Sequence, residues 1–151
     1  MKKKDWGNAV WLLFHTLAHK LKPEYSNETG ILFTHINNIC NNLPCPDCQE
    51  HANKILSRTN KKAIASSKES LIQFLYVFHN MVNKSINTPE FPKEKLNIYA
   101  NANTRNVVAH FIKLMSSNMN NDKLMMDSFR RQNYMSVFIN YIKMNGYKYN
   151  A

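Results

Sequence analysis

Apolar side chains recur every three or four residues along almost the whole chain of 151 residues, the spacing of one face of an α-helix. No segment alternates apolar and polar residues in the way that a half-buried strand does. Only 3 glycines and 5 prolines interrupt the pattern, so long regular elements with few tight turns are expected. The chain is therefore predicted to be all-α.

The first part of this pattern predicts four helices and a short fifth one. Asp5 is expected to cap the first helix, and Ser66 and Glu69 have the spacing of a capping box at the start of the fourth. The expected helices run from Asp5 to about Leu21, from Ser26–Glu28 to about Asn42, from Cys45 to about Ser57, from the end of a polar linker (Arg58–Ser67) to about Ile86, and from Pro92 through Tyr99.

A second group of apolar residues follows at 107–114 and resumes after a polar stretch, Ser116–Asp122. Its spacing predicts further helices that pack on the bundle or on a partner, with Gly146 as the cap of the last one. Methionine is flexible and polarisable, so four methionines would give this region an adaptable surface: Met115, Met119, Met125 and Met126.

The net charge of +10 would favour an anionic partner such as nucleic acid. However, the lysines are scattered among asparagines and gather on no single helical face, so no nucleic-acid partner is expected. No apolar run approaches the ~20 residues needed to cross a bilayer. The run Ala9–Phe14 behind Lys2–Lys4 is also too short for a signal peptide, and we expect neither a membrane span nor a secretion signal.

Cys45 and Cys48 stand three residues apart where the third helix is expected to begin. Pro46 suits the first helical position, because its missing N–H would have no partner there. The free N–H groups at a helix start favour the thiolate, the form of cysteine that attacks disulfides, flavins and metals, although Asp47 acts against it. The pair is therefore a candidate redox dithiol.

Two other interpretations of the pair stay open. Zinc could be held by Cys45, Cys48 and His51, with Cys40 as a fourth ligand, but the chain lacks a second CxxC or an HxxxH pair. The two thiols could also be inert. Because the βαβ pattern of thioredoxin-like proteins is missing, a redox pair in this helical chain would need another electron acceptor.

Three sequence blocks resemble the Erv/ALR family of FAD-linked sulfhydryl oxidases, with compact virus-encoded members as the nearest match. The blocks stand in the family's order and with family-like spacing. One such block is a weak signal, whereas three together are a strong one. They are WGNAVWLLFH (Trp6–His15), LPCPDCQEHA (Leu43–Ala52) and HNMVNK (His79–Lys84).

The resemblance implies a four-helix bundle with a short fifth helix, a homodimer, and FAD bound at one end of the bundle. Cys45 and Cys48 would be the catalytic cysteines, with Cys48 beside the flavin and Cys45 exchanging with substrate. Because the resemblance ends near residue 100, we expect an oxidase domain over residues 1–102 and a helical extension of unassigned role over 103–151. Seven residues would bind FAD, the last of them near its phosphates: Trp11, His15, His51, His79, Asn80, Asn83 and Lys84.

The chain also departs from the family. It reads Ile-Asn-Thr-Pro at Ile86–Pro89, where the family often has Leu-Gly-Lys-Pro, so a cation is missing there. No cysteine follows Cys48, which removes a later structural pair, and the family's usual shuttle disulfide is absent as well. Cys40 lies on an apolar stripe and is expected to be a buried core thiol, with pairing across a dimer as the minor alternative.

The resulting hypothesis is an FAD-dependent sulfhydryl oxidase that forms disulfides in thiol-containing substrate proteins and passes the electrons through flavin to O2, giving H2O2. If the viral resemblance holds, the expected location is the cytoplasm of an infected cell. The rival hypothesis is a helical binding module without enzymatic activity, whose CxxC holds zinc or is inert.

Overall fold

Helices supply all the regular structure of the described residues. The computed structural model describes residues 3–117 and 125–151, and these ranges contain no strand, only an isolated bridge between Leu21 and Tyr149. The prediction of an all-α protein is confirmed. The α-helices are α1 (Lys3–Lys20), α2 (Thr29–Cys40), α3 (Pro46–Ser57), α4 (Lys61–Ile64), α5 (Lys68–Ser85), α6 (Asn97–Ala100), α7 (Thr104–Ser117) and α8 (Met125–Asn145), and the 3-10 turns are η1 (Pro23–Glu28), η2 (Lys93–Lys95) and η4 (Gly146–Lys148).

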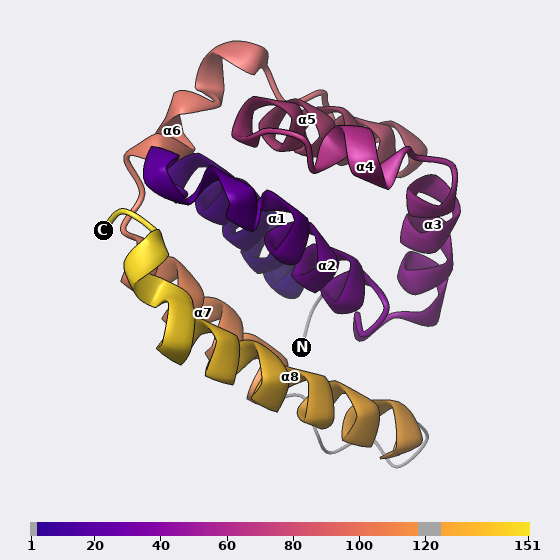
Figure 1. Ribbon diagram of the computed structural model, residues 1–151. Helices are drawn as coiled ribbons and strands as arrows, with labels where there is room; N and C mark the ends of the chain where they lie inside the picture. The colour runs from indigo at the N-terminus through magenta and orange to yellow at the C-terminus, as the bar shows by residue number, and fades with distance from the viewer. Residues whose placement is uncertain (1–2, 118–124) are drawn as a thin grey trace.

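Helix α1 lies in the middle of the molecule, between α5 on one side and the α7–α8 pair on the other (Figure 1). Its side chains Leu13, Phe14 and Leu17 are each at most 2% exposed. Full burial of such a side chain is worth about 1.5–3 kcal/mol, so α1 anchors the elements around it. Helix α3, which begins with the cysteine pair, packs against α2 at one end of this arrangement (Figure 1).

Helices α7 and α8 run side by side and pack on the bundle, which confirms the first of the two arrangements expected for this region (Figure 1). Phe111 of α7 and Phe138 of α8 are both 0% exposed, and their rings meet edge to face with centroids 5.5 Å apart. The division of the chain at residue 102 stays a prediction. In the structure, residues on both sides of it contribute to one hydrophobic core.

A buried polar cluster fastens the end of the α7–α8 pair to the start of α2. The carboxylate of Glu28, which is 4% exposed, accepts a hydrogen bond from the Tyr141 hydroxyl at 3.1 Å and pairs with the Lys148 ammonium at 2.8 Å. The Tyr141 and Tyr149 hydroxyls are 2.7 Å apart. A buried carboxylate without partners would strongly destabilise the fold, so these contacts make the position of Glu28 tolerable.

Two predicted helix caps are wrong. Helix α1 begins at Lys3, so Asp5 lies in its first turn instead of capping it. Helix α5 is capped by Ser67 and not by Ser66, because the Ser67 hydroxyl accepts the N–H of Ser70 at 3.0 Å. The region expected to be a plain linker also contains the one-turn helix α4.

The end of the chain differs from expectation in two further details. Gly146 does follow α8, but its backbone is not left-handed and it opens the turn η4 instead of capping the helix. Met115 is 2% exposed and belongs to the core, so its assignment to an adaptable surface is wrong. Met119 and the side chains of Met125 and Met126 lie outside the described residues.

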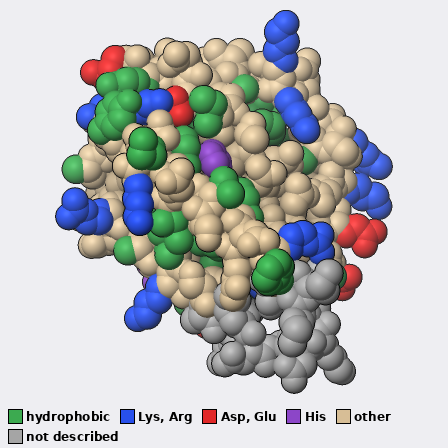
Figure 2. All heavy atoms as spheres, turned by 60° about the horizontal axis from the view of Figure 1, so that its bottom comes forward, with side chains coloured by type: hydrophobic (Ala, Val, Ile, Leu, Met, Phe, Trp, Pro, Cys, Tyr) green, Lys and Arg blue, Asp and Glu red, His purple; other side chains and the backbone are tan. Residues whose placement is uncertain are grey.

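Lysine and arginine side chains are spread around the face shown in Figure 2 and do not gather into one patch there. Hydrophobic side chains lie between them on the same face (Figure 2). Within the two described ranges, no helix combines the length and the apolarity needed to span a bilayer.

Candidate active site

The two cysteines of the CxxC form a disulfide at the start of α3, with their Cα atoms 5.2 Å apart. Cys45 has extended backbone angles and is the N-cap, and Pro46 is the first helical residue, as the sequence predicted. The backbone N–H of Cys48 donates to the Cys45 sulfur at 3.2 Å. The helix start thus directs an N–H group at the Cys45 sulfur, a contact that would stabilise a thiolate there once the disulfide is open.

A cavity of about 890 Å³ opens beside this disulfide, within the range of about 300–1,000 Å³ typical of ligand pockets. Cys48 lines it, whereas Cys45 does not. Its walls come mainly from α1, α3 and α5, and they combine aromatic rings with histidine, amide and lysine side chains. The lining residues used below are Lys4, Gly7, Trp11, Phe14, Cys40, Cys48, His51, Phe78, His79, Asn83 and Thr88.

Trp11 and His79 form the aromatic part of one wall, stacked with centroids 4.2 Å apart and an angle of 9° between the rings. His15 lies behind them and does not line the cavity. Its Nε2 is 3.0 Å from Nδ1 of His79, and its ring stacks on Tyr99 with centroids 4.4 Å apart. His15 therefore holds His79 in place from the core side.

Both imidazoles of this pair are held in the neutral form. Burial, with smaller contributions from His79 and His19, lowers the pKa of His15 to about 3. Burial also lowers the pKa of His79 to about 4. One ring nitrogen donates to the other, as two neutral imidazoles can, while Nδ1 of His15 is buried without a partner.

Asn80 and Asn83 have different places. Asn83 is 7% exposed and lines the cavity, and its Nδ2 donates to the side-chain oxygen Oδ1 of Asn80 at 3.4 Å. Asn80 lies outside the lining and exchanges two hydrogen bonds with the backbone of Phe91, at 2.8 and 3.2 Å. Asn80 therefore fixes the loop after α5.

The lysine that lines the cavity is Lys4 and not Lys84, which is exposed. Lys4 was missed from the sequence, although Lys4 and Trp11 are seven residues apart on α1 and so share a helical face. Five of the site residues expected from the sequence line the cavity: Trp11, Cys48, His51, His79 and Asn83. The other four lie outside the lining: Cys45, His15, Asn80 and Lys84.

The turn after α5 shows how the chain accommodates its departure from Leu-Gly-Lys-Pro. Asn87 has a φ of 57°, a left-handed conformation that asparagine tolerates better than most residues with a side chain. Thr88, at the position of the family lysine, lines the cavity. Asn87 thus adopts a conformation that glycine would adopt without strain, and Thr88 brings no positive charge to the cavity.

Cys40 is a free thiol, 2% exposed, which confirms the expectation of a buried core thiol. Burial raises its pKa to about 12. Residues 3–117 and 125–151 contain no cluster of three His, Cys, Asp or Glu side chains arranged to hold a metal ion.

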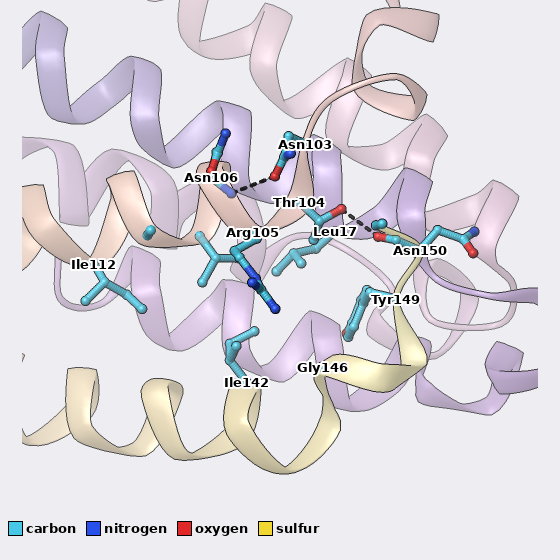
Figure 3. Close-up of a pocket in the computed structure, with 13 residues that line it drawn as sticks. Leu17, Asn103, Thr104, Arg105, Asn106, Ile112, Ile142, Gly146, Tyr149 and Asn150 are labelled. Atoms are coloured by element: carbon cyan, nitrogen blue, oxygen red, sulfur yellow. Dashed lines mark hydrogen bonds between the residues drawn. The ribbon is translucent and has the colours of Figure 1, made fainter.

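A second cavity, of about 680 Å³, lies between α1, α7 and the turn after α8 (Figure 3). Its walls are mostly apolar, with Leu17, Ile112 and Ile142 among them, and Arg105 and several asparagines also line it. It contains neither cysteine nor histidine and none of the residues expected to act in the site.

A sequence profile described as the Erv1 / Alr family matches residues 8–105. The chain belongs to this family. The matched residues include the cysteine pair and the wall residues Trp11, His51, His79 and Asn83, and they end at the beginning of α7. The α7–α8 pair is thus an addition to the part that the Erv1/Alr profile describes.

Three relatives of this family member illustrate the similarity. Two viral proteins are named as candidate FAD-linked sulfhydryl oxidases. Protein 096R of Invertebrate iridescent virus 3 is 34% identical over 58% of this chain and 60% of its own length. Protein FPV093 of Fowlpox virus (strain NVSL) is 29% identical over 60% of this chain and 87% of its own length. The FAD-linked sulfhydryl oxidase ERV1 of Arabidopsis thaliana is 36% identical over 62% of this chain and 49% of its own length. The chain thus spans about half the length of the plant relative. No solved structure gives a significant match.

We predict that acid destabilises the fold through His15. The pKa of this group is depressed on folding, so unfolding takes up a proton at any pH between about 3 and the ordinary value of 6.5. The stabilising contribution is complete above that value and is lost as the pH falls. When the pH falls from 8 to 5, protonation linked to His15 should lower the free energy of unfolding by about 2 kcal/mol. Urea denaturation at the two pH values measures this difference.

His15→Gln should remove that part of the pH dependence. Thr16→Val is the matched control, because the Thr16 hydroxyl is buried without a partner and does not titrate in this range. It should raise the stability equally at both pH values. An unchanged difference between pH 8 and pH 5 in His15→Gln would contradict the prediction.

Proposed function

We propose that this chain is an FAD-dependent sulfhydryl oxidase that forms disulfides in substrate proteins. The observation that carries the proposal is the position of Cys48. This residue is bonded to Cys45, which is half-buried, and it also lines a large cavity with aromatic and hydrogen-bonding walls, so the disulfide would link a substrate thiol at Cys45 to a ligand in the cavity. The names of the three relatives point to the same activity.

The residues around the cavity fit a flavin dinucleotide. Its flat ring system needs aromatic walls, which Trp11, Phe14 and Phe78 offer, and its diphosphate needs a cation, which Lys4 offers. Gly7 lets the cavity reach the main chain of α1, because a Cβ added there would meet nothing within 4 Å. His51, His79 and Asn83 would complete the FAD contacts, and His15 and Asn80 would support these from behind.

Thiol–disulfide exchange at the cysteine pair would proceed in two steps. A substrate thiolate attacks the Cys45 sulfur, which breaks the Cys45–Cys48 bond and releases Cys48 as a thiolate facing the cavity. A second substrate thiolate then attacks the substrate sulfur of the mixed disulfide and releases Cys45. The substrate gains a disulfide, and the pair gains two electrons and, with protons, becomes a dithiol.

FAD, when bound, would accept this electron pair and allow O2 to act as the final oxidant, giving H2O2. The N–H of Cys48 would stabilise a thiolate at Cys45 through the contact it already makes with that sulfur. We extend the proposal to a homodimer and to the cytoplasm of an infected cell, on the grounds of the family and of its viral relatives.

The absorption spectrum of the purified protein, before and after addition of a dithiol, tests the function directly. The oxidase should be yellow, and it should lose that colour when a dithiol is added in the absence of oxygen. Colourless protein carrying one equivalent of zinc would instead support the rival binding module.

Serine variants of the two cysteines should separate their roles. Cys48→Ser should abolish reduction of bound FAD by a dithiol, because the sulfur that lines the cavity is lost. Cys45→Ser should leave Cys48 as a thiolate beside the flavin, seen as a long-wavelength charge-transfer absorbance. If the charge-transfer absorbance appears in Cys48→Ser and not in Cys45→Ser, the assignment of roles is wrong.

Gly7→Ala should stabilise the protein without FAD and yet weaken FAD binding. A glycine inside a helix lowers stability by about 0.5–1 kcal/mol relative to alanine, so its removal should raise the free energy of unfolding by that amount. The new methyl group would occupy cavity space, and overpacking of about 1 kcal/mol or more corresponds to at least about fivefold in Kd.

Gly30→Ala is the matched control for Gly7→Ala. Gly30 lies in α2 outside the cavity, and a Cβ there meets only Ala65 at an ordinary 3.9 Å. This variant should be stabilised in the same way with an unchanged Kd for FAD by fluorescence quenching. Equal affinities of the two variants would exclude Gly7 from the FAD site.

Lys4→Met should weaken FAD binding about fivefold at low salt, whereas Lys84→Met should not, because of the two lysines only Lys4 lines the cavity. Riboflavin has no phosphate, so its affinity should be the same in both variants. Adding Thr88→Lys to Lys4→Met should restore part of the affinity. A loss in Lys84→Met with none in Lys4→Met would reverse the assignment of the phosphate contact.

A further inference from the structure

Helix α8 makes a direct contact with the turn that leads into the redox pair. Arg131 is 3% exposed, and its Nε donates a hydrogen bond to the backbone carbonyl of Asn42 at 2.8 Å. Asn42 lies between the end of α2 and Cys45, three residues before the cysteine. A residue outside the family profile thus reaches the backbone next to the CxxC.

Side chains hold this turn at two adjacent carbonyls. Gln49 of α3 donates to the carbonyl of Leu43 at 2.6 Å, and Arg131 donates to that of Asn42. The Asn42 amide in turn donates to the carbonyl of Asn38 in α2 at 2.8 Å. Two of these three bonds come from within the bundle, and the third comes from the α7–α8 pair.

The two cysteines differ in how firmly the bundle itself holds them. Cys48 belongs to α3, whereas Cys45 precedes the helix with extended backbone angles, φ −156° and ψ 108°. When the disulfide opens, Cys45 and the turn before it are therefore the part that is able to move away. A restraint on that turn keeps the Cys45 sulfur near Cys48 and favours the closed disulfide, since a well-placed pair of groups has a high effective concentration.

We propose that Arg131 is a positioning residue for the redox pair, through which the α7–α8 pair shifts the thiol–disulfide equilibrium of Cys45 and Cys48 toward the disulfide. This inference rests on the proposed function, in which that pair is the redox centre. Arginine suits the role, because its guanidinium is a planar donor and hydrogen bonds from charged groups are stronger than neutral ones.

The test measures the equilibrium of the full-length protein with glutathione. One protein disulfide and two glutathione thiols give the protein dithiol and one glutathione disulfide. The state of Cys45 and Cys48 is read by mass after alkylation. Arg131→Met keeps the apolar stem and loses the donor, and it should shift this equilibrium about tenfold toward the dithiol, which is about 30 mV for a two-electron couple.

Tyr134→Phe is the matched control. Tyr134 also lies on α8 and contacts α2, where its hydroxyl is 2.8 Å from His35 Nδ1 and donates to the His35 carbonyl at 3.1 Å, so its hydrogen bonds go to α2 and not to the turn carbonyl that Arg131 holds. Tyr134→Phe should lower the melting temperature and leave the glutathione equilibrium at its wild-type value. If Arg131→Met also lowers stability without moving the equilibrium, the positioning role is refuted.

Arg131→Lys keeps the charge but moves the donor atom, so its equilibrium constant should lie between those of the wild type and Arg131→Met. If Arg131→Met does not fold, a wild-type constant in Arg131→Lys refutes the proposal. The measurement needs no bound FAD. A wild-type protein that fails to bind FAD would therefore overturn the oxidase function, while the equilibrium would still decide the role of Arg131.

Discussion

The burial of helix α1 is the constraint on which the rest of the structure depends. One set of its side chains, including Leu13 and Leu17, is enclosed between α5 and α7, and another set, including Trp11, forms the wall of the cavity. Because both sets belong to one rigid helix, packing in the core fixes the position of the cavity wall.

The neutral pair of His15 and His79 also connects the core to the cavity wall, through a hydrogen bond instead of apolar packing. His15 is enclosed with aromatic neighbours, and it bonds to His79 without a charge that the core would have to accommodate. A flavin site benefits from walls of this kind, because neutral groups orient a ligand by hydrogen bonding while the charge of the diphosphate is met elsewhere. Under the proposed function, that place would be the exposed N-terminal turn of α1, where Lys4 lines the cavity.

The sequence is sufficient to predict the long helices and the residues that share their faces, but it misses the one-turn helix α4. Apolar spacing alone indicates an all-α fold, and Pro46 alone indicates the start of α3. It does not reveal which neighbour on a helix faces a cavity. Asn83 and Lys84 are adjacent, but successive side chains on a helix point about 100° apart, so one lines the cavity and the other faces solvent.

The spacing of residues along the sequence also does not predict contacts between distant parts of the chain. Arg131 is separated from Asn42 by 89 residues, and an arginine on a helix is usually expected to be exposed. Its burial follows from how α8 lies against the turn after α2, which is a property of the assembled fold. The caps fail for a related reason: serines stand at both 66 and 67, and only the backbone geometry decides which of them caps α5.

Cys40 is a third cysteine whose buried thiol stays outside the disulfide. It shares a cavity with Cys48, yet burial raises its pKa to about 12, so the thiol is protonated at neutral pH. Exchange requires the ionised form and access to the sulfur, so protonation and burial both act against attack by Cys40 on the neighbouring disulfide. In a chain with three cysteines, this favours the Cys45–Cys48 pairing over pairings that involve Cys40.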